Sequence, residues 1–184
     1  MTHDRNDGNT IDKDEARTPS ILFKKLDERF HFHADVCASD TNHLCDLYWT
    51  KETNSLIQEW HKLPGMNTKP IIFCQPPYSN PAPFIQKSAE ESRNGATCVM
   101  LIPADTACKA FHKYIIGVEM ATDGTITPND FGASEIIFLK PRVTFNNPDG
   151  TKMKGSPKFG SMVVVFDKST FTGKPVISSM GWKE

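Results

Sequence analysis

The stretch IIFCQPPYS, residues 71–79, is a hydrophobic run that stops abruptly at two prolines. Its first four residues are apolar and include two β-branched side chains, which predicts a buried strand. Pro76 and Pro77 lack backbone N–H groups and have restricted φ angles, so neither residue can continue the strand inside a sheet. The loop at this point is therefore stiff. It begins with the amide of Gln75 and carries the ring of Tyr78 directly after the prolines.

This loop has the groups that a flat heterocycle with an amino group requires. The side-chain oxygen of Gln75 and the carbonyl of Pro76 can each accept one amino hydrogen, and Tyr78 can stack on the ring. The alternative is a strand that ends in a proline-rich turn and binds nothing. The residues of the loop by themselves leave both interpretations open.

Other short apolar segments alternate with helical patterns, which is typical of an α/β fold around a mostly parallel sheet. Strands are also predicted at 30–36, 98–103, 135–139 and 161–166, and helices from Thr18-Pro19 to about 26, at 41–49, 55–63 and 81–94, and from Asp105 to about 116. Ligands of such sheets lie beyond the carboxyl ends of the strands. Asp35, Gln75 and Asp105 each fall at the end of a predicted strand, so we expect them near a ligand.

The chain has 184 residues, of which 38% are hydrophobic and 23% charged, as in ordinary folded proteins. One domain is expected over residues 18–184, because residues 1–17 are polar, nearly free of large apolar side chains and expected to be disordered. No segment has the pattern of a signal peptide or a membrane span, which favours the cytoplasm. The five cysteines form no CxxC pair, so we expect reduced thiols and no metal site.

A formal net charge of −1 excludes a global basic field, so a nucleic-acid partner requires a local basic patch. Residues 136–160 provide such a patch, with five cations against the single acid Asp149. The cations are Lys140, Arg142, Lys152, Lys154 and Lys158. Prolines and glycines in the same stretch indicate a loop. A basic loop suits phosphate contact, although a merely solvated loop has the same composition.

Eight features in fixed order carry a resemblance to a known family. They are TPSILFKKLDERFHFHADVCAS (18–39), the series Asn42, Cys45, Tyr48 and Thr50, FCQPPYS (73–79), KSAEES (87–92), VMLIPADT (99–106), FH (111–112), EIIFLKPRVTF (135–145) and GSMVVVF (160–166). A strand followed by Pro-Pro and an aromatic residue resembles the catalytic motif of amino-group DNA methyltransferases. Over roughly residues 18–167 the chain resembles the phage-type DNA N-6-adenine methyltransferase (Dam) family.

The resemblance implies a Rossmann-like methyltransferase fold, with helices on both faces of the sheet and S-adenosylmethionine as cofactor. It also implies a site-specific reaction on the 6-amino group of adenine in double-stranded DNA, after the base has flipped out of the helix. The catalytic residues would be Gln75, Pro76, Pro77 and Tyr78. Lys140 and Arg142 align with a basic region of the family, so we expect them to contact DNA together with Ser79 and the other three cations of the basic loop.

The same resemblance places six residues at the cofactor, and the position of Glu52 after a second predicted strand adds a seventh candidate. The six are Thr18, Pro19, Asp35, Cys37, Ala38 and Ser39. The Thr-Pro pair opens the segment that closes over the cofactor, and residues 37–39 replace the glycine loop of other methyltransferases. Asp35 would bind the ammonium group, although by itself it also suits a helix cap. Glu52 lies 17 residues further on, where a carboxylate commonly holds ribose hydroxyls.

Gln75 departs from the motif, which has Asp, Asn or Ser before the prolines. Gln keeps the acceptor but adds one methylene, and a displacement of about 1 Å can cost on the order of a hundredfold in rate. Three hypotheses therefore stay open: an active adenine methyltransferase, a protein that binds S-adenosylmethionine or DNA without catalysis, and an enzyme that methylates another amino group.

Several properties are left open by these patterns, among them the DNA target and the choice between monomer and homodimer. Base reading is expected from the loops at 142–160 or 61–70, because the chain has no room for a separate recognition domain. The resemblance to phage proteins implies a phage or prophage origin and action in a bacterial cytoplasm.

Overall fold

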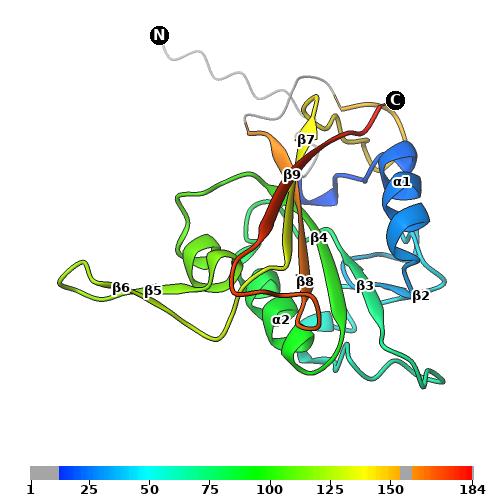
Figure 1. Ribbon diagram of the computed structural model, residues 1–184. Helices are drawn as coiled ribbons and strands as arrows, with labels where there is room; N and C mark the ends of the chain where they lie inside the picture. The colour runs from blue at the N-terminus through cyan, green and yellow to red at the C-terminus, as the bar shows by residue number, and fades with distance from the viewer. Residues whose placement is uncertain (1–12, 154–158, 184) are drawn as a thin grey trace, which may run out of the picture.

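The computed structural model describes residues 13–153 and 159–183. The strands are β1 (Ala34–Asp35), β2 (Leu47–Tyr48), β3 (Ile71–Cys74), β4 (Thr97–Pro103), β5 (Val118–Met120), β6 (Ile126–Pro128), β7 (Glu135–Lys140), β8 (Ser161–Asp167) and β9 (Val176–Gly181). The helical segments are η1 (Lys13–Glu15), α1 (Ser20–Phe30), η2 (Ser55–Ile57), α2 (Ala82–Arg93) and η3 (Phe111–Ile116). A central sheet has the order β2-β1-β3-β4-β8-β7-β9, and β5 and β6 form a separate hairpin (Figure 1).

The sheet is mostly parallel, so the predicted α/β class is confirmed. β1 pairs in parallel with β2 on one side and β3 on the other, and β3 pairs in parallel with β4. β8 is antiparallel to β4 and β7, whereas β9 is parallel to β7. The order of strands reverses at β1. A crevice outside the carboxyl ends of the strands at such a reversal is where open α/β sheets bind ligands.

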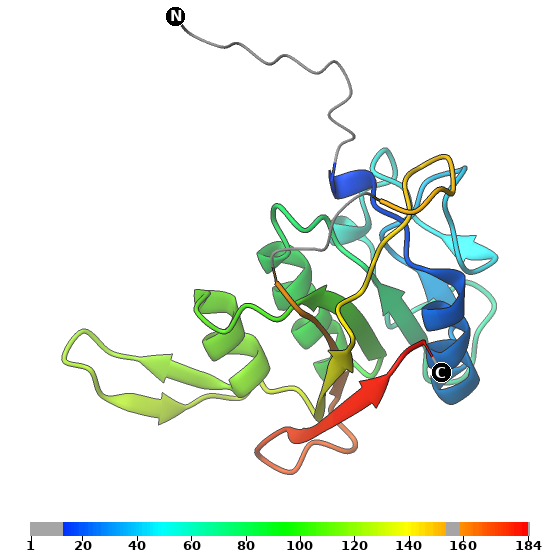
Figure 2. The same ribbon diagram turned by 90° about the horizontal axis from the view of Figure 1, so that it is seen from above.

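Helices cover both faces of the sheet, as expected (Figure 2). Leu22 and Leu26 of α1 belong to one core cluster together with Val99 of β4. Ile85 of α2 belongs to the cluster on the opposite face together with Cys98. Cys98 and Val99 are neighbours whose side chains point to opposite faces of β4. Both faces of this strand are thus buried, which explains its uninterrupted apolar sequence.

The interior strands and one helix agree with the sequence-based prediction to within one residue at each end. These elements are β3, β4, β7 and β8, together with α2. The strand predicted at 30–36 is much shorter. α1 continues to Phe30 and ends at His31, whose φ of 57° is left-handed, and only Ala34 and Asp35 pair in the sheet.

Two predicted helices are wrong. Residues 41–49 contain the strand β2, which pairs with β1, and residues 55–63 contain only the 3₁₀ turn η2. Trp60 and Leu63 are buried, whereas Ile57 of the same predicted face is 74% exposed. The indole N–H of Trp60 donates to the carbonyl of Ser55 at 2.8 Å and so joins the two ends of this loop segment. The spacing of apolar residues therefore indicated the burial of only part of the set and did not correspond to a helix.

The helix predicted from Asp105 starts later. The Asp105 carboxylate accepts the N–H of Ala107 at 2.9 Å within a loop, and the segment η3 that follows is π-helical. Residues 13–17, expected to be disordered, contact the rest of the chain: Arg17 exchanges two backbone hydrogen bonds with Asn146, at 2.8 and 3.0 Å. Residues 1–12 of the same predicted segment lie outside the described residues.

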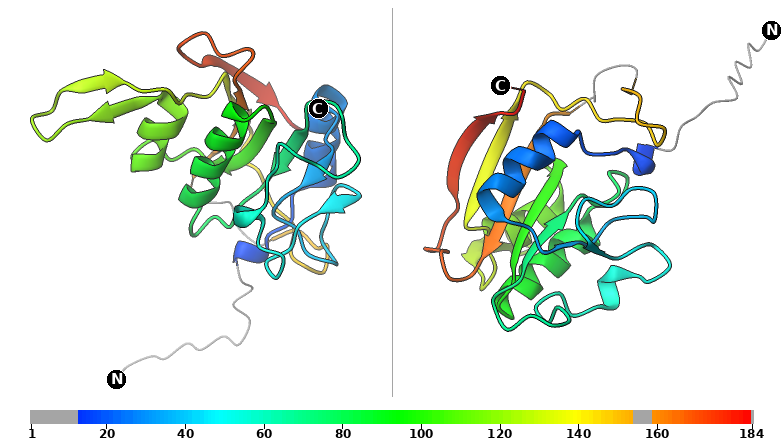
Figure 3. Two further views of the ribbon diagram at one scale, coloured as in Figure 1. Left: turned by 90° about the horizontal axis from the view of Figure 1, so that it is seen from below. Right: turned by 90° about the vertical axis from the view of Figure 1, so that its right-hand side faces the viewer.

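Two elements were not expected from the sequence. The β5–β6 hairpin stands away from the sheet (Figure 3), and β9 adds a strand beside β7. Within the described ranges, no helix is long and apolar enough to cross a membrane.

A buried carboxylate holds the loop around residue 61 against α2. Glu91 is only 2% exposed, accepts the Nδ1 and backbone N–H groups of His61 at 2.6 and 2.9 Å, and pairs with Lys87 at 2.6 Å. Residues 61–70 then lead into the amino end of β3. They therefore approach the sheet from the edge opposite to Gln75.

Glu91→Ala is expected to lower the free energy of unfolding by about 3 kcal/mol, because it leaves Lys87 without its partner in a largely buried position. Denaturant titration followed by circular dichroism would measure the loss. The matched control is Glu90→Ala, which removes an exposed contact to Gln86 and should cost less than about 0.5 kcal/mol. Equal losses in the two variants would contradict the assigned role of Glu91.

Candidate active site

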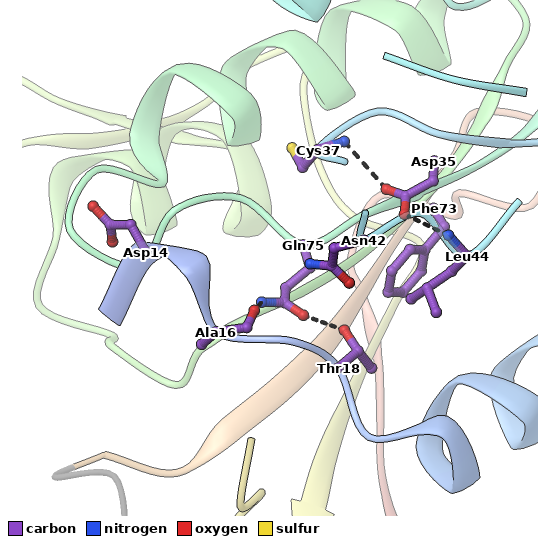
Figure 4. Close-up of a pocket in the computed structure, with 9 residues that line it drawn as sticks. All are labelled: Asp14, Ala16, Thr18, Asp35, Cys37, Asn42, Leu44, Phe73 and Gln75. Atoms are coloured by element: carbon purple, nitrogen blue, oxygen red, sulfur yellow. Dashed lines mark hydrogen bonds between the residues drawn. The ribbon is translucent and has the colours of Figure 1, made fainter. Parts of the chain in front are cut away.

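A small polar crevice lies at the carboxyl ends of β1 and β3, where the strand order reverses. It encloses about 30 Å³ and is lined by Asp14, Ala16, Thr18, Asp35, Cys37, Asn42, Leu44, Phe73 and Gln75 (Figure 4). The lining comes from the N-terminal segment, the β1–β2 connection and the end of β3. The crevice therefore brings together segments that are far apart in the sequence.

Asp35 is the buried charge of this crevice. The side chain sits at the end of β1, 3% exposed, and accepts the backbone N–H of Cys37 and of Leu44, both at 3.2 Å. Burial raises the pKa of Asp35 from 3.8 to about 6, although the two backbone N–H groups and the charge of His43 act in the opposite direction. No helix starts after β1 in the described chain, so the helix-cap interpretation of Asp35 does not apply.

Gln75 directs its amide toward the N-terminal segment. Its side-chain oxygen accepts the hydroxyl of Thr18, and its nitrogen donates to the carbonyl of Ala16 at 2.8 Å (Figure 4). Both ends of the amide are thus occupied by residues 16–18. Pro76 is buried, and none of the hydrogen bonds among the described residues uses its carbonyl oxygen.

Residues 13–19, which we call the strap, are held to the site at two further points. The Asp14 carboxylate accepts the backbone N–H of Ser79 at 3.0 Å and also the hydroxyl of that residue. At the other end, Arg17 and Asn146 form the isolated two-bond bridge described above. The strap therefore crosses from the loop after β3 to the loop after β7.

A second, larger cavity of about 340 Å³ lies on the other side of the loop after β3. Its lining is Tyr78, Ser79, Asn80, Pro81, Ala82, Ile85, Ile102, Pro103, Asp105, Cys108, Ile115, Phe159 and Met162. Tyr78 packs edge-to-face on Phe145, with ring centroids 5.2 Å apart, and its hydroxyl donates to Ser161 at 3.3 Å. Burial raises the pKa of Tyr78 well above its usual value, so its hydroxyl stays protonated.

The remaining cofactor residues predicted from the sequence lie near the crevice to different degrees. Pro19 is buried beside Thr18, and Cys37 lines the crevice with its thiol 3.5 Å from that of Cys74. Ala38 and Ser39 lie in the β1–β2 connection, where they bond to the backbone of Trp49 and Asn42, respectively. Glu52 is exposed in the turn after β2 and lines neither cavity.

Of the predicted DNA-contacting cations, Lys140 is the last residue of β7, and Arg142 and Lys152 lie on the loop that follows it. All three are exposed, whereas Lys154 and Lys158 lie outside the described residues. The carboxyl end of β4 pairs with the amino end of β8, so this loop sits at the same edge of the sheet as the crevice.

Two residues of the site were missed by sequence reasoning. Asp14 lies in a polar segment without apolar periodicity, so no local signal distinguishes it from its acidic neighbours. Phe159 is 62% exposed and follows a Gly- and Pro-containing stretch. A large aromatic residue exposed in a basic loop was the signal that could have identified it.

The fold defines a protein of the Rossmann-like α/β class, with two cavities at the carboxyl edge of its sheet, where proteins of this class bind ligands. The family model for DNA N-6-adenine-methyltransferase (Dam) matches residues 7–181. The chain therefore belongs to the DNA N-6-adenine-methyltransferase (Dam) family.

Two relatives carry the same description. A DNA N-6-adenine-methyltransferase of Haemophilus phage HP1 (strain HP1c1) is 34% identical over 161 residues, which cover 85% of this chain and 80% of that protein. Another, of Escherichia phage T1, is 29% identical over 149 residues, or 77% of this chain. The match spans only 60% of the length of the T1 protein.

Asp35 gives the folded protein a characteristic pH dependence. Its pKa is about 6 when folded and near 3.8 when unfolded, so the folded state binds more protons between these values. The group therefore contributes stability below about pH 4 that is lost as the pH rises through about 6, to a total of about 3 kcal/mol.

We expect the difference in unfolding free energy between the wild type and Asp35→Asn to change by about this amount between pH 4 and pH 7. Urea titrations of both proteins across that range would measure it. Subtracting the unfolding free energy of the variant from that of the wild type at each pH removes the contributions of all other titrating groups. A difference that stays constant with pH would contradict the raised pKa.

Proposed function

We propose that this protein transfers a methyl group from S-adenosylmethionine to the 6-amino group of adenine at specific sites in double-stranded DNA. The observation that carries the proposal is the position of the loop 75–79 between two cavities of different character. Gln75 lines the polar crevice beside Asp35, and Tyr78 lines the larger cavity beside Phe159. A cofactor in the first and a base in the second would meet at this loop.

The crevice suits the charged end of the cofactor. The raised pKa of Asp35 reflects a buried carboxylate with little opposite charge nearby, and an ammonium group would supply that charge. Thr18 and Cys37 form adjoining walls, with Pro19 behind them. The cofactor, when bound, supplies a methyl group already activated on a sulfonium, so the chain itself need only position the acceptor.

Positioning of the amino group is assigned to the loop after β3. The side-chain oxygen of Gln75 and the carbonyl of Pro76 would each accept one amino hydrogen, which favours the partial positive charge that grows on nitrogen during transfer. Pro77 keeps the loop stiff. Tyr78 and Phe159 would hold the flipped base between aromatic surfaces, because the target atom is inaccessible while the base is paired.

DNA contact is assigned to the basic loop between β7 and β8, and Ser79 would join it at the cavity mouth. Lys140, Arg142 and Lys152 lie at the same edge as both cavities, so phosphates bound there would place the duplex over the site. Lys154 and Lys158 belong to the same loop by sequence. Ala38 and Ser39 would approach the cofactor through the backbone of the β1–β2 connection, and Glu52, which lines neither cavity, would reach it only with a cofactor that extends beyond the crevice. The protein would act in the bacterial cytoplasm.

A second candidate is a protein that binds the cofactor or DNA without catalysis. The hydrogen bonds of Gln75 support it, because both ends of the amide are occupied by the strap. Methylation of another amino group, such as that of cytosine or of a glutamine side chain, uses the same loop chemistry and differs only in the product.

The deciding experiment is transfer of labelled methyl from S-adenosylmethionine to unmethylated duplex DNA, with the modified nucleoside identified by mass spectrometry. We expect N6-methyladenine from the wild type and a loss of about 10²–10³ in kcat for Gln75→Ala, which removes the acceptor. Gln75→Asn should stay active because it keeps the amide, and Gln86→Ala, an exposed position of α2, is the control.

Each other outcome selects a different hypothesis. No product from the wild type but product from Gln75→Asn identifies a binder whose catalysis is blocked at one residue. Methylcytosine or methylated protein identifies another amino group as the acceptor. Absence of both product and cofactor binding in every variant contradicts the proposed function.

Phe159→Ala should lower kcat/KM for DNA by about 10- to 100-fold, because stacking on an aromatic side chain stabilises an unpaired base by ~1–3 kcal/mol. The slope of affinity against salt concentration should stay unchanged, since no phosphate contact is removed. Phe138→Ala, at a partly exposed position on β7, is the matched control. Equal kcat/KM in the wild type and Phe159→Ala would exclude Phe159 from the base cavity.

A further inference from the structure

The structure shows the strap in a closed position over the crevice. The space left beside the strap, about 30 Å³, is enough for one or two water molecules. A pocket for a ligand the size of a cofactor occupies about 300 Å³ or more. The walls formed by Asp35 and Cys37 belong to the sheet and the loop after β1, whereas Asp14, Ala16 and Thr18 belong to the strap. The strap is therefore the part whose movement would open the crevice.

We infer that Asp14 is the latch of this strap, and that its release from Ser79 admits the cofactor and frees the amide of Gln75 in a single movement. The inference rests on the proposed function, since it concerns how the cofactor of that reaction enters. Asp14 is not among the residues that the family resemblance places at the site.

The contacts of the strap separate a hinge from a latch. Near its carboxyl end, Arg17 is held by two backbone hydrogen bonds to Asn146, and α1 begins directly after Pro19. On the amino side of Arg17, the Asp14 carboxylate accepts two hydrogen bonds from Ser79, and the carbonyl of Ala16 accepts one from the Gln75 amide. A swing about Arg17 separates Asp14 from Ser79 and Ala16 from Gln75, and leaves the bridge intact.

Gln75 couples this movement to the reacting group. Its amide lies on the crevice side of the loop, bonded to Ala16 and Thr18, while Tyr78 faces the cavity on the other side. To accept an amino hydrogen from a base in that second cavity, the amide has to turn away from the strap. The displacement of Ala16 that makes room for the cofactor also removes the carbonyl that holds the amide nitrogen back, whereas Thr18, which lies between the bridge and α1, stays in place.

The length of Gln75 is what allows this coupling. An Asn at the same position is one methylene shorter, so it cannot reach both partners in the strap with the backbone of β3 unchanged. The extra methylene of Gln75 thus matters for the contacts that its amide makes while the strap is closed. In the open state the amide offers the same acceptor chemistry as a shorter one.

The test compares Asp14→Ala with Glu15→Ala, which removes the same charge from the neighbouring, exposed position. Amide hydrogen exchange of the free full-length protein should be at least about tenfold faster at Ser79 and at residues 14–16 in Asp14→Ala, because a hydrogen bond to a charged group commonly contributes a factor of ten or more. The Glu15→Ala protein should exchange like the wild type. Asp14→Asn keeps one acceptor oxygen, so its exchange rates should lie between those of Asp14→Ala and those of the wild type.

Cofactor entry is measured separately, by stopped-flow association with S-adenosylmethionine. We expect the association rate constant to rise about tenfold in Asp14→Ala and not in Glu15→Ala, since the fraction of open protein limits the rate. Gln75→Asn should also raise it, because the strap loses two contacts.

The outcomes distinguish this inference from the proposed function. Unchanged exchange in Asp14→Ala, or faster exchange with an unchanged association rate, overturns the latch. If no variant binds S-adenosylmethionine, yet exchange is faster in Asp14→Ala, the latch is supported and the proposed function is contradicted instead.

Discussion

The structure depends on the point at which β3 stops. β3 lies between β1 and β4, so its carboxyl end emerges beside the reversal of strand order. Two consecutive prolines end it there, because neither can donate a hydrogen bond to a neighbouring strand. A loop that is stiff before any ligand arrives loses little entropy on binding one. Three segments remote in sequence then pack against this loop: the strap through Asp14, the β7–β8 loop through Phe145, and the start of β8 through Ser161.

The polar groups at this edge of the sheet are arranged at a cost to stability. Asp35 is buried with two backbone donors and no close cation of full charge, and its raised pKa expresses that cost directly. Glu91, by contrast, is equally buried but is paired with Lys87 and bonded to His61. A carboxylate left without a charged partner in a crevice is a feature of ligand sites more than of scaffolds. The contrast agrees with a stabilising role for Glu91 and with the ligand role proposed for Asp35.

The sequence predicts those parts of the fold whose environment is uniform along the chain. β3, β4, β7 and β8 are buried on one or both faces over their whole length, so their residues form continuous apolar runs. β1 and β2 are two residues long and are defined by their partners, which no local pattern reveals. Trp60 is buried by a loop that a side-chain hydrogen bond holds in place. The helical spacing of the apolar residues around it therefore gave a wrong prediction of a helix.

Site residues divide in the same way. Asp35 ends β1 and Gln75 directly follows β3, and the Pro-Pro pair before Tyr78 marks the position of that residue in the loop. Asp14 and Phe159 reach the site through tertiary contacts of exposed segments, and such contacts leave no trace in the spacing of neighbouring residues.

Positive and negative side chains are concentrated in different parts of the molecule. This distribution matters more for the approach of DNA than the net charge of −1. The loop at 140–158 has five cations and one acid, whereas residues 117–130, which include the β5–β6 hairpin, have three acids and no lysine or arginine. Figure 2 shows the hairpin on the side away from residues 141–153. At physiological salt a charge acts over only about 8 Å, so the hairpin hardly weakens the attraction of the loop for phosphate. Two of the acids in residues 117–130 are also paired with cations, Glu119 with Lys113 at 2.9 Å and Asp130 with Arg93 at 3.5 Å. The approach of the duplex therefore depends on the basic loop beside both cavities and not on the hairpin.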